Sequence, residues 1–182
     1  MGDDRDGKQV KHVADQFFEI VDEQDRVIGL RRRSECHGNP SLVHRVAHVL
    51  IFDPAGRLLL QKRARTKDIQ PGRWDTSVGG HLDPGEDYLT AAYREMKEEL
   101  GIEQGALQPL YPSQMRNDVE SENVMTYFLC YDGKIHFAED EIEAVRYWSA
   151  QEIDAALGSG TLTPNFEQEW QRWKRYQAES KK

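Results

Sequence analysis

The chain of 182 residues is predicted to fold as an α/β sandwich with a mixed sheet. Two observations carry this prediction. Short apolar segments typical of strands lie on both sides of one acidic helix in the middle of the chain, and a second long helix follows them near the C-terminus. The length suits one domain with a sizeable core, which we expect over residues 15–178, after a flexible tail of residues 1–14.

The first strands come from the N-terminal half. Residues 17–21 and 26–31 flank four acidic or amide residues, a pattern that predicts a hairpin. Residues 43–52 are the strongest strand candidate. The turn Asp53-Pro54-Ala55-Gly56 follows, and residues 57–63 are expected to be the partner strand.

The C-terminal half supplies further strands and two helices. Strands are predicted at residues 74–78, 124–131 and 145–148, and a short helix at 151–157. A longer helix is predicted to begin after Thr163-Pro164, with the threonine as the cap and the proline in the first turn.

That last helix carries an aromatic stripe at helical spacing: Phe166, Trp170, Trp173 and Tyr176. Such a stripe could recognise a base or a partner chain, but aromatic residues at this spacing more often belong to the core. We therefore expect core packing.

The central helix is predicted over residues 87–100. Its residues are good helix formers, Gly101 follows as a C-terminal stop, and acidic residues stand at the start, where the helix dipole favours negative charge. Glu95, Glu98 and Glu99 then share one helix surface.

Three carboxylates at that spacing repel one another, and a hard divalent cation such as Mg²⁺ or Mn²⁺ would remove this cost. Arg94 stands four residues before Glu98 and can pair with it. The plainer interpretation is a solvated acidic face, which is common on helices.

The residues from Gly80 to Ile102, GHLDPGEDYLTAAYREMKEELGI, match the pattern G-x5-E-x7-R-E-U-x-E-E-x-G-U, where U is aliphatic, at every defined position. This segment resembles the signature of the Nudix (MutT-like) hydrolases. The resemblance implies an α/β/α sandwich with a catalytic loop-helix-loop and a cofactor ion, Mg²⁺ or Mn²⁺. It also implies that the ion is held by Glu95, Glu98, Glu99 and the carbonyl of Gly80.

The same resemblance implies that a metal-activated water attacks a diphosphate in a substrate of the form nucleoside diphosphate linked to X. Glu98 is the first candidate for the base, with Glu120, Glu122 and the loop Glu139-Asp140-Glu141 as outside candidates. Arg94 is expected to orient the carboxylates.

Three histidines narrow the resemblance further. Together with GRWDTSVGGH at residues 72–81, His37, His44 and His81 resemble the isopentenyl-diphosphate isomerase branch of the superfamily, in which histidines and carboxylates hold a metal. A surface or satisfied core histidine is an equally open interpretation for these three. It is favoured for His48 and for His12 and His136.

By the same resemblance, Arg63 and Lys67 would bind the diphosphate. One departure matters more than these matches. The isomerase protonates an alkene with a cysteine just before the Gly-His pair, and Gly79 stands there instead. The second catalytic group of the isomerase, a glutamate, falls near Asn123, with Glu120 and Glu122 close by.

Composition limits the partners. The net charge of −8 argues against nucleic acid, no apolar run is long enough to span a bilayer, and the start MGDDRDGK is too charged for a signal peptide. Cys36 and Cys130 form neither a CxxC motif nor a paired framework, which favours a reducing cytoplasm. A small-molecule diphosphate is the expected partner, and a homodimer is left open.

Three functions follow. The first is metal-dependent diphosphate hydrolysis, favoured by Gly79 and by the complete motif from Gly80 to Ile102, called the Nudix box below. The alternatives are an isopentenyl-diphosphate isomerase-like reaction and a non-catalytic nucleotide-binding module. Group X is read outside the motif, so the sequence does not name it.

Overall fold

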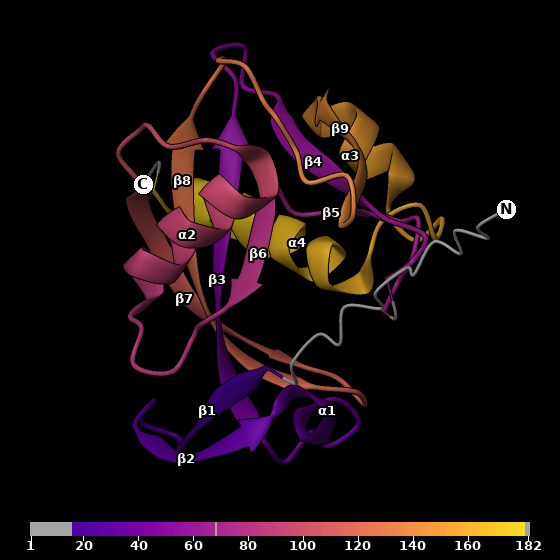
Figure 1. Cartoon of the computed structure of the whole chain (residues 1–182). Helices are drawn as coiled ribbons and strands as arrows, with labels where there is room; N and C mark the ends of the chain where they lie inside the picture. The colour runs from indigo at the N-terminus through magenta and orange to yellow at the C-terminus, as the bar shows by residue number, and fades with distance from the viewer. Residues whose placement is uncertain (1–15, 68, 181–182) are drawn as a thin grey trace, which may run out of the picture.

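The computed structural model describes residues 16–67 and 69–180. In this part of the chain, nine strands form one mixed sheet, and helices pack on both of its faces (Figure 1). The predicted tail, residues 1–14, lies outside the described residues, and a single domain over 15–178 stays a prediction. No helix among the described residues combines the length and the apolar character that crossing a membrane requires.

The strands are β1 (Phe17–Val21), β2 (Val27–Arg32), β3 (Val43–Phe52), β4 (Leu58–Arg63), β5 (Trp74–Asp75), β6 (Val78–His81), β7 (Gln108–Arg116), β8 (Ser121–Cys130) and β9 (Ile142–Trp148). The helices are α1 (Arg33–Cys36), α2 (Tyr88–Leu100), α3 (Ala150–Ala156) and α4 (Pro164–Glu179).

Strand β3 organises the sheet. It runs parallel to β8 along its whole length, from Val43 opposite Ser121 to Phe52 opposite Cys130. It runs antiparallel to β6, with which it pairs over four residues. The parallel pair makes the sheet mixed, as the sequence predicts.

Side chains of β3 alternate between two cores. Ala47, Val49 and Ile51 belong to the core that contains the buried face of α2. Leu50 and Phe52 belong to the core that contains α3 and α4. Figure 1 shows α2 and α4 on opposite faces of the sheet. The α/β/α sandwich is therefore confirmed.

The predicted aromatic stripe of α4 is core. Phe166, Trp170 and Trp173 are buried, and Tyr176 packs against the same cluster. Thr163 caps the helix by accepting a hydrogen bond from the backbone N–H of Phe166 at 3.1 Å, with Pro164 in the first turn. These contacts confirm the predicted start of the helix.

One strand prediction is confirmed in part, and another needs correction. Strand β4 pairs with β3 at one position, Phe52 opposite Leu58, and its long antiparallel partner is β9. The edges of β3 are already taken by β6 and β8, so β4 diverges after the turn. The sheet consequently opens between β4 and β6.

The predicted strand at residues 74–78 is two strands. Strand β5 pairs with β4, whereas β6 pairs with β3 and runs on to His81. Ser77 lies at the change of partner: its Oγ donates to the carbonyl of Leu59 at 2.6 Å and accepts from the N–H of Ile51 at 2.9 Å. This side chain bridges the two halves of the sheet.

Strand β7 was not predicted. Pro109 and Pro112 interrupt its strand pattern. Both prolines are tolerated because β7 pairs on one side with β8, and its other edge carries no partner strand among the described residues.

Candidate active site

Helix α2 packs its apolar face on β3 and β6 and directs Glu95 and Glu99 toward β6, called here the glycine strand because it carries Gly79 and Gly80. Asp87 caps it by accepting from the N–H of Thr90 at 2.8 Å, and Gly101 ends it with a φ of 65°. Met96 and Leu100 are buried on the apolar face. This packing sets the rotation of the helix.

Glu95 lies directly against Gly80 of β6. A Cβ atom on Gly80 would overlap the carboxyl group and Cγ of Glu95, so any other residue at this position would displace the Glu95 side chain. Burial raises the pKa of Glu95, while the hydrogen bond from Arg94 at 2.7 Å opposes that rise. The first glycine of the motif thus makes room for a motif carboxylate.

Glu99 is the most enclosed of the three box glutamates. Its carboxylate accepts from the side-chain N–H of Gln61 at 3.1 Å and lies 3.4 Å from the backbone nitrogen of Gly79. Burial raises the pKa of Glu99 well above its usual value, and the charge of Glu95 adds to the effect. The buried Glu99 and the half-buried Glu95 therefore both lie against β6, and their charges repel each other.

Arg94 ties the motif together. Its guanidinium donates to Glu86 at 2.8 Å, to Glu95 at 2.7 Å and to the carbonyl of His81 at 2.9 Å. The predicted pair with Glu98 is present but longer, at 3.3 Å. Its hydrogen bonds to the carboxylates of Glu86 and Glu95 raise the pKa of Arg94, so it stays charged. Its main contact is Glu86, which the sequence analysis did not assign to it.

The glutamates considered as the general base lie at different places in the structure. The side chain of Glu98 is 59% exposed, so its carboxylate is more open to solvent than those of Glu95 and Glu99. Of the outside candidates, Glu141 acts electrostatically on both Glu95 and Glu99. Glu120 and Glu122 instead lie beside the histidines.

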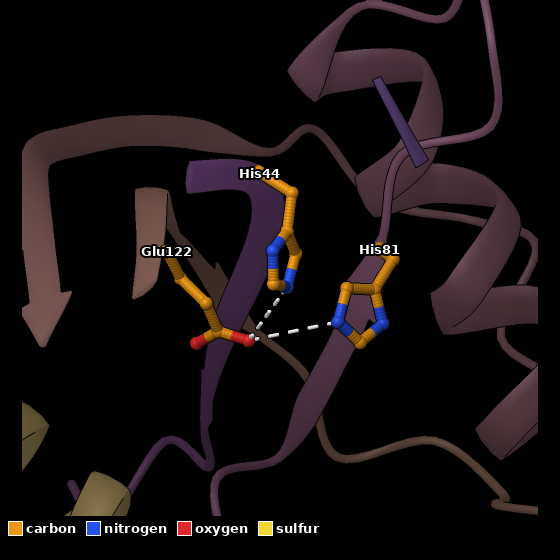
Figure 2. A group of neighbouring side chains, drawn as sticks. All are labelled: His44, His81 and Glu122. Carbon is orange, nitrogen blue, oxygen red and sulfur yellow. Dashed lines mark ion pairs between the residues drawn. The ribbon is translucent and has the colours of Figure 1, made fainter. Parts of the chain in front are cut away.

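His44, His81 and Glu122 converge from β3, β6 and β8 (Figure 2). One Glu122 oxygen lies 3.7 Å from Nε2 of His44 and 3.6 Å from Nε2 of His81. Their potential ligand atoms all lie within 4.8 Å of one another. The parallel register places His44 directly opposite Glu122, and Phe18 stacks on both imidazoles.

His37 and Glu120 extend this group. Nε2 of His37 lies 3.7 Å from a carboxylate oxygen of Glu120, and its ring centre is 6.1 Å from that of His81. The three histidines named from the sequence are thus brought together with the two acidic residues. Asn123, where the alignment placed the isomerase glutamate, instead pairs with Arg116 and Asp25.

The donor chemistry fits a divalent cation. The Nε2 atoms of His44 and His81 are buried and have no hydrogen-bond partner within the described residues. Burial lowers the pKa of His44 to about 4 and that of His81 to about 3, which keeps both imidazoles neutral, as ligation requires. Burial raises the pKa of Glu120 to about 7 and also raises the pKa of Glu122. A cation would satisfy the nitrogens and offset the carboxylate charge.

A cavity of about 330 Å³ lies beside this cluster and reaches the glycine strand and the N-terminal turn of α4. Arg63 lines it, paired with Asp75 at 3.2 Å. Lys67, the other predicted phosphate ligand, does not line it and pairs with Glu141 at 2.7 Å. The geometry therefore favours Arg63 over Lys67 as a substrate contact.

His48 also lines the cavity, although the sequence favoured a surface or satisfied core residue there. It is buried and hydrogen-bonded to Glu169, so the core interpretation is right in part. The strand alternation His44, Val46, His48 was the available signal, since it puts His48 on the same face of β3 as His44.

Comparisons with known proteins agree with this architecture. A family model described as NUDIX domain matches residues 42–166. An uncharacterized Nudix hydrolase from Yersinia pestis is 40% identical over 87 residues, 48% of this chain and 47% of that protein. This chain therefore aligns with about half the length of that relative.

An isopentenyl-diphosphate Delta-isomerase from Serratia proteamaculans is 34% identical over 155 residues, 82% of this chain and 84% of that protein. Among solved structures, DR0079 from Deinococcus radiodurans has a TM-score of 0.76 at 23% identity and covers 86% of this chain and 98% of that one. The structural likeness shows the fold, and the family model together with the isomerase alignment shows the family. The chain belongs to the Nudix family.

Proposed function

We propose that the protein hydrolyses a diphosphate bond in a substrate of the form nucleoside diphosphate linked to X, by divalent-metal-assisted attack of water. The observation that carries the proposal is a pair of box carboxylates, the buried Glu99 and the half-buried Glu95, held against Gly79 and Gly80 of β6. Their mutual repulsion and burial are costly unless a cation shares the site.

The box donors are oxygens, which suit Mg²⁺ or Mn²⁺: the carboxylates of Glu95, Glu98 and Glu99, with the Gly80 carbonyl. When bound, the cation would polarise a phosphoryl oxygen and lower the pKa of a water. His37, His44 and His81, with Glu120 and Glu122, offer a second, imidazole-rich set, which suits Mn²⁺ or Zn²⁺ better than Mg²⁺.

Side chains of the protein would orient the metal ligands, bind phosphate and accept the proton from water. Arg94 holds Glu95 and Glu86 in fixed positions, and Arg63 would bind a phosphate oxygen from the cavity wall. Glu98 is our first candidate for the group that removes the proton from water, because it is the accessible member of the trio. Glu141 is the outside candidate with the best position.

A second candidate function, isopentenyl-diphosphate isomerisation, is favoured by the histidine and glutamate cluster and by the similarity to isomerases. It lacks its acid. Residue 79 is a glycine, and a Cβ atom there would lie 3.3 Å from the His48 ring and 3.2 Å from Thr76. The space beside residue 79 is therefore already filled by an imidazole.

The test is phosphate-product release from a panel of nucleoside-diphosphate sugars, dinucleoside polyphosphates, NADH, FAD, coenzyme A and isopentenyl diphosphate, with Mg²⁺ or Mn²⁺. Metal-dependent turnover that is lost in Glu98→Gln and kept in Glu103→Gln supports the proposal. Glu103 is a matched control because it is an exposed glutamate just beyond the same helix. Binding without turnover of any member would instead support a nucleotide-binding module.

We place this activity in the cytoplasm. Cys36 and Cys130 are both free, Cys36 buried and Cys130 exposed, which suits a reducing compartment. The proposed partner is the small-molecule substrate, and nucleic acid and membrane play no part in the proposal. A homodimer stays open.

A further inference from the structure

A buried histidine–carboxylate pair connects β3 to α4 beside the cavity. Nδ1 of His48 lies 3.2 Å from one oxygen of Glu169, and Glu169 is fully buried. The other oxygen of Glu169 accepts from the hydroxyl groups of Tyr111 at 2.8 Å and Thr126 at 3.1 Å. Donors on three strands therefore hold a single carboxylate of α4 in place.

The surroundings indicate that the pair is ionised. A buried carboxylate needs a compensating charge, and within residues 16–67 and 69–180 His48 is the ion-pair partner of Glu169. Burial opposes the charge on both groups. Even so, the hydrogen bond between them leaves the pKa of Glu169 lowered and that of His48 raised.

Other charged or titratable groups act on His48 from the neighbouring strands. They are Glu122 on β8, Asp75 on β5 and His81 on β6. The two carboxylates favour the imidazolium, so the acidic surroundings as a whole support a positive charge on His48.

The second nitrogen of His48 faces the cavity side of the glycine strand. A Cβ atom on Gly79 would lie 3.4 Å from Nε2, and both residues line the cavity together with Gly80. Gly80 in turn has the carboxylate of Glu95 against it on the face toward α2. The backbone of β6 therefore lies between His48 and the proposed metal-binding carboxylates.

We propose that His48 contacts the substrate by donating a hydrogen bond from Nε2 to an anionic oxygen of the bound diphosphate, and that Glu169 is a positioning residue for this imidazole. The inference rests on the proposed function and adds to it a cationic donor from the sheet face opposite the box. An ion pair that orients one ring nitrogen and leaves the other toward a cavity is suited to binding an anion.

The first test measures binding, without turnover, of methylenediphosphonate, a hydrolysis-resistant diphosphate, to the full chain in Mg²⁺ by calorimetry. A charge-assisted hydrogen bond is worth about 10- to 100-fold in affinity, so His48→Gln is expected to weaken binding by that factor. His136→Gln is the matched control, because His136 is exposed, and should bind as the wild type does.

A pH series separates contact from structural support. The ratio of wild-type to His48→Gln affinity should shrink as the pH rises, because the deprotonated imidazole loses its Nε2 proton. Glu169→Gln should weaken binding less than His48→Gln and should shift this pH dependence to lower pH, since the carboxylate no longer stabilises the imidazolium. A purely structural role predicts a ratio that does not change with pH.

Nitrogen NMR of the wild-type imidazole gives a readout that needs no variant. The Nε2 resonance of His48 should shift on saturation with methylenediphosphonate. An unmoved resonance, or equal affinities of His48→Gln and His136→Gln, would overturn the inference while leaving a hydrolytic wild type intact. A wild type that neither binds the diphosphonate nor turns over any diphosphate overturns the proposed function, and the inference with it.

Discussion

Replacing Gly80 by alanine should destabilise the protein far more than replacing its neighbour Gly79. The added methyl at residue 80 would overlap the carboxyl group of Glu95, which is held by Arg94 at 2.7 Å. At residue 79 the nearest atoms are 3.2–3.4 Å away and need to yield by a few tenths of an ångström. The two glycines are adjacent on β6, so they form a matched pair.

The magnitude follows from the contacts. Overpacking a filled site costs about 1–3 kcal/mol, and displacing Glu95 from Arg94 adds about 1 kcal/mol. Both alanines gain the same small entropic benefit in the unfolded chain, so that effect cancels in the comparison. We expect Gly80→Ala to be about 2–4 kcal/mol less stable than the wild type, which corresponds to a Tm about 4–16 °C lower for a chain of this length, and we expect Gly79→Ala to lose clearly less.

Urea and thermal denaturation followed by circular dichroism measure this difference, and the assay is made in EDTA so that metal binding does not contribute. Wild type and both alanine variants are compared at one pH. Equal stabilities of the two variants would refute the reasoning, because they would mean that Glu95 does not lie against Gly80.

Three further results are expected. Gly79→Cys should form no allylic diphosphate from isopentenyl diphosphate in an NMR assay, since His48 fills the adjacent space; product formation would show that the imidazole yields readily. Mn²⁺ at 100 times its Kd should raise the free energy of unfolding of the wild type by about 2.7 kcal/mol, and the Tm should rise with it. His44→Ala should lose much of this gain, and an undiminished rise in Tm would mean that the ion binds elsewhere. Without metal, the free energy of unfolding should fall as the pH drops from about 6.5 toward 4. The reason is that His44 has its pKa lowered to about 4 in the folded chain, so the unfolded chain binds a proton that the folded chain does not. His44→Gln should show a shallower fall, and equal slopes in urea titrations would contradict this.

Helices α2, α3 and α4 and the sheet core could be predicted because each has a local cause, whereas the four-residue helix α1 was not predicted. The cap at Thr163, the stop at Gly101 and the apolar spacing of the box helix all act within a few residues. Strand partners could not be predicted as well, since pairing depends on competition for edges. The turn after β3 therefore suggested a hairpin with β4, whereas β6 and β8 occupy the edges of β3.

The candidate site shows the same division. The three box glutamates share one helix, so their proximity follows from spacing alone. Glu122 reaches His44 through a parallel pairing of strands 78 residues apart in the chain, as the difference 122 − 44 gives, and no local pattern encodes that register. The His48–Glu169 contact spans 121 residues and escaped prediction for this reason.

Glu169 lies on α4 three residues beyond the segment that the family model matches, which ends at residue 166. A chain trimmed to that boundary would keep the box and the histidine cluster but lose the carboxylate that His48 binds. Sequence change in the last helix can therefore alter the environment of this imidazole while the family signature stays intact.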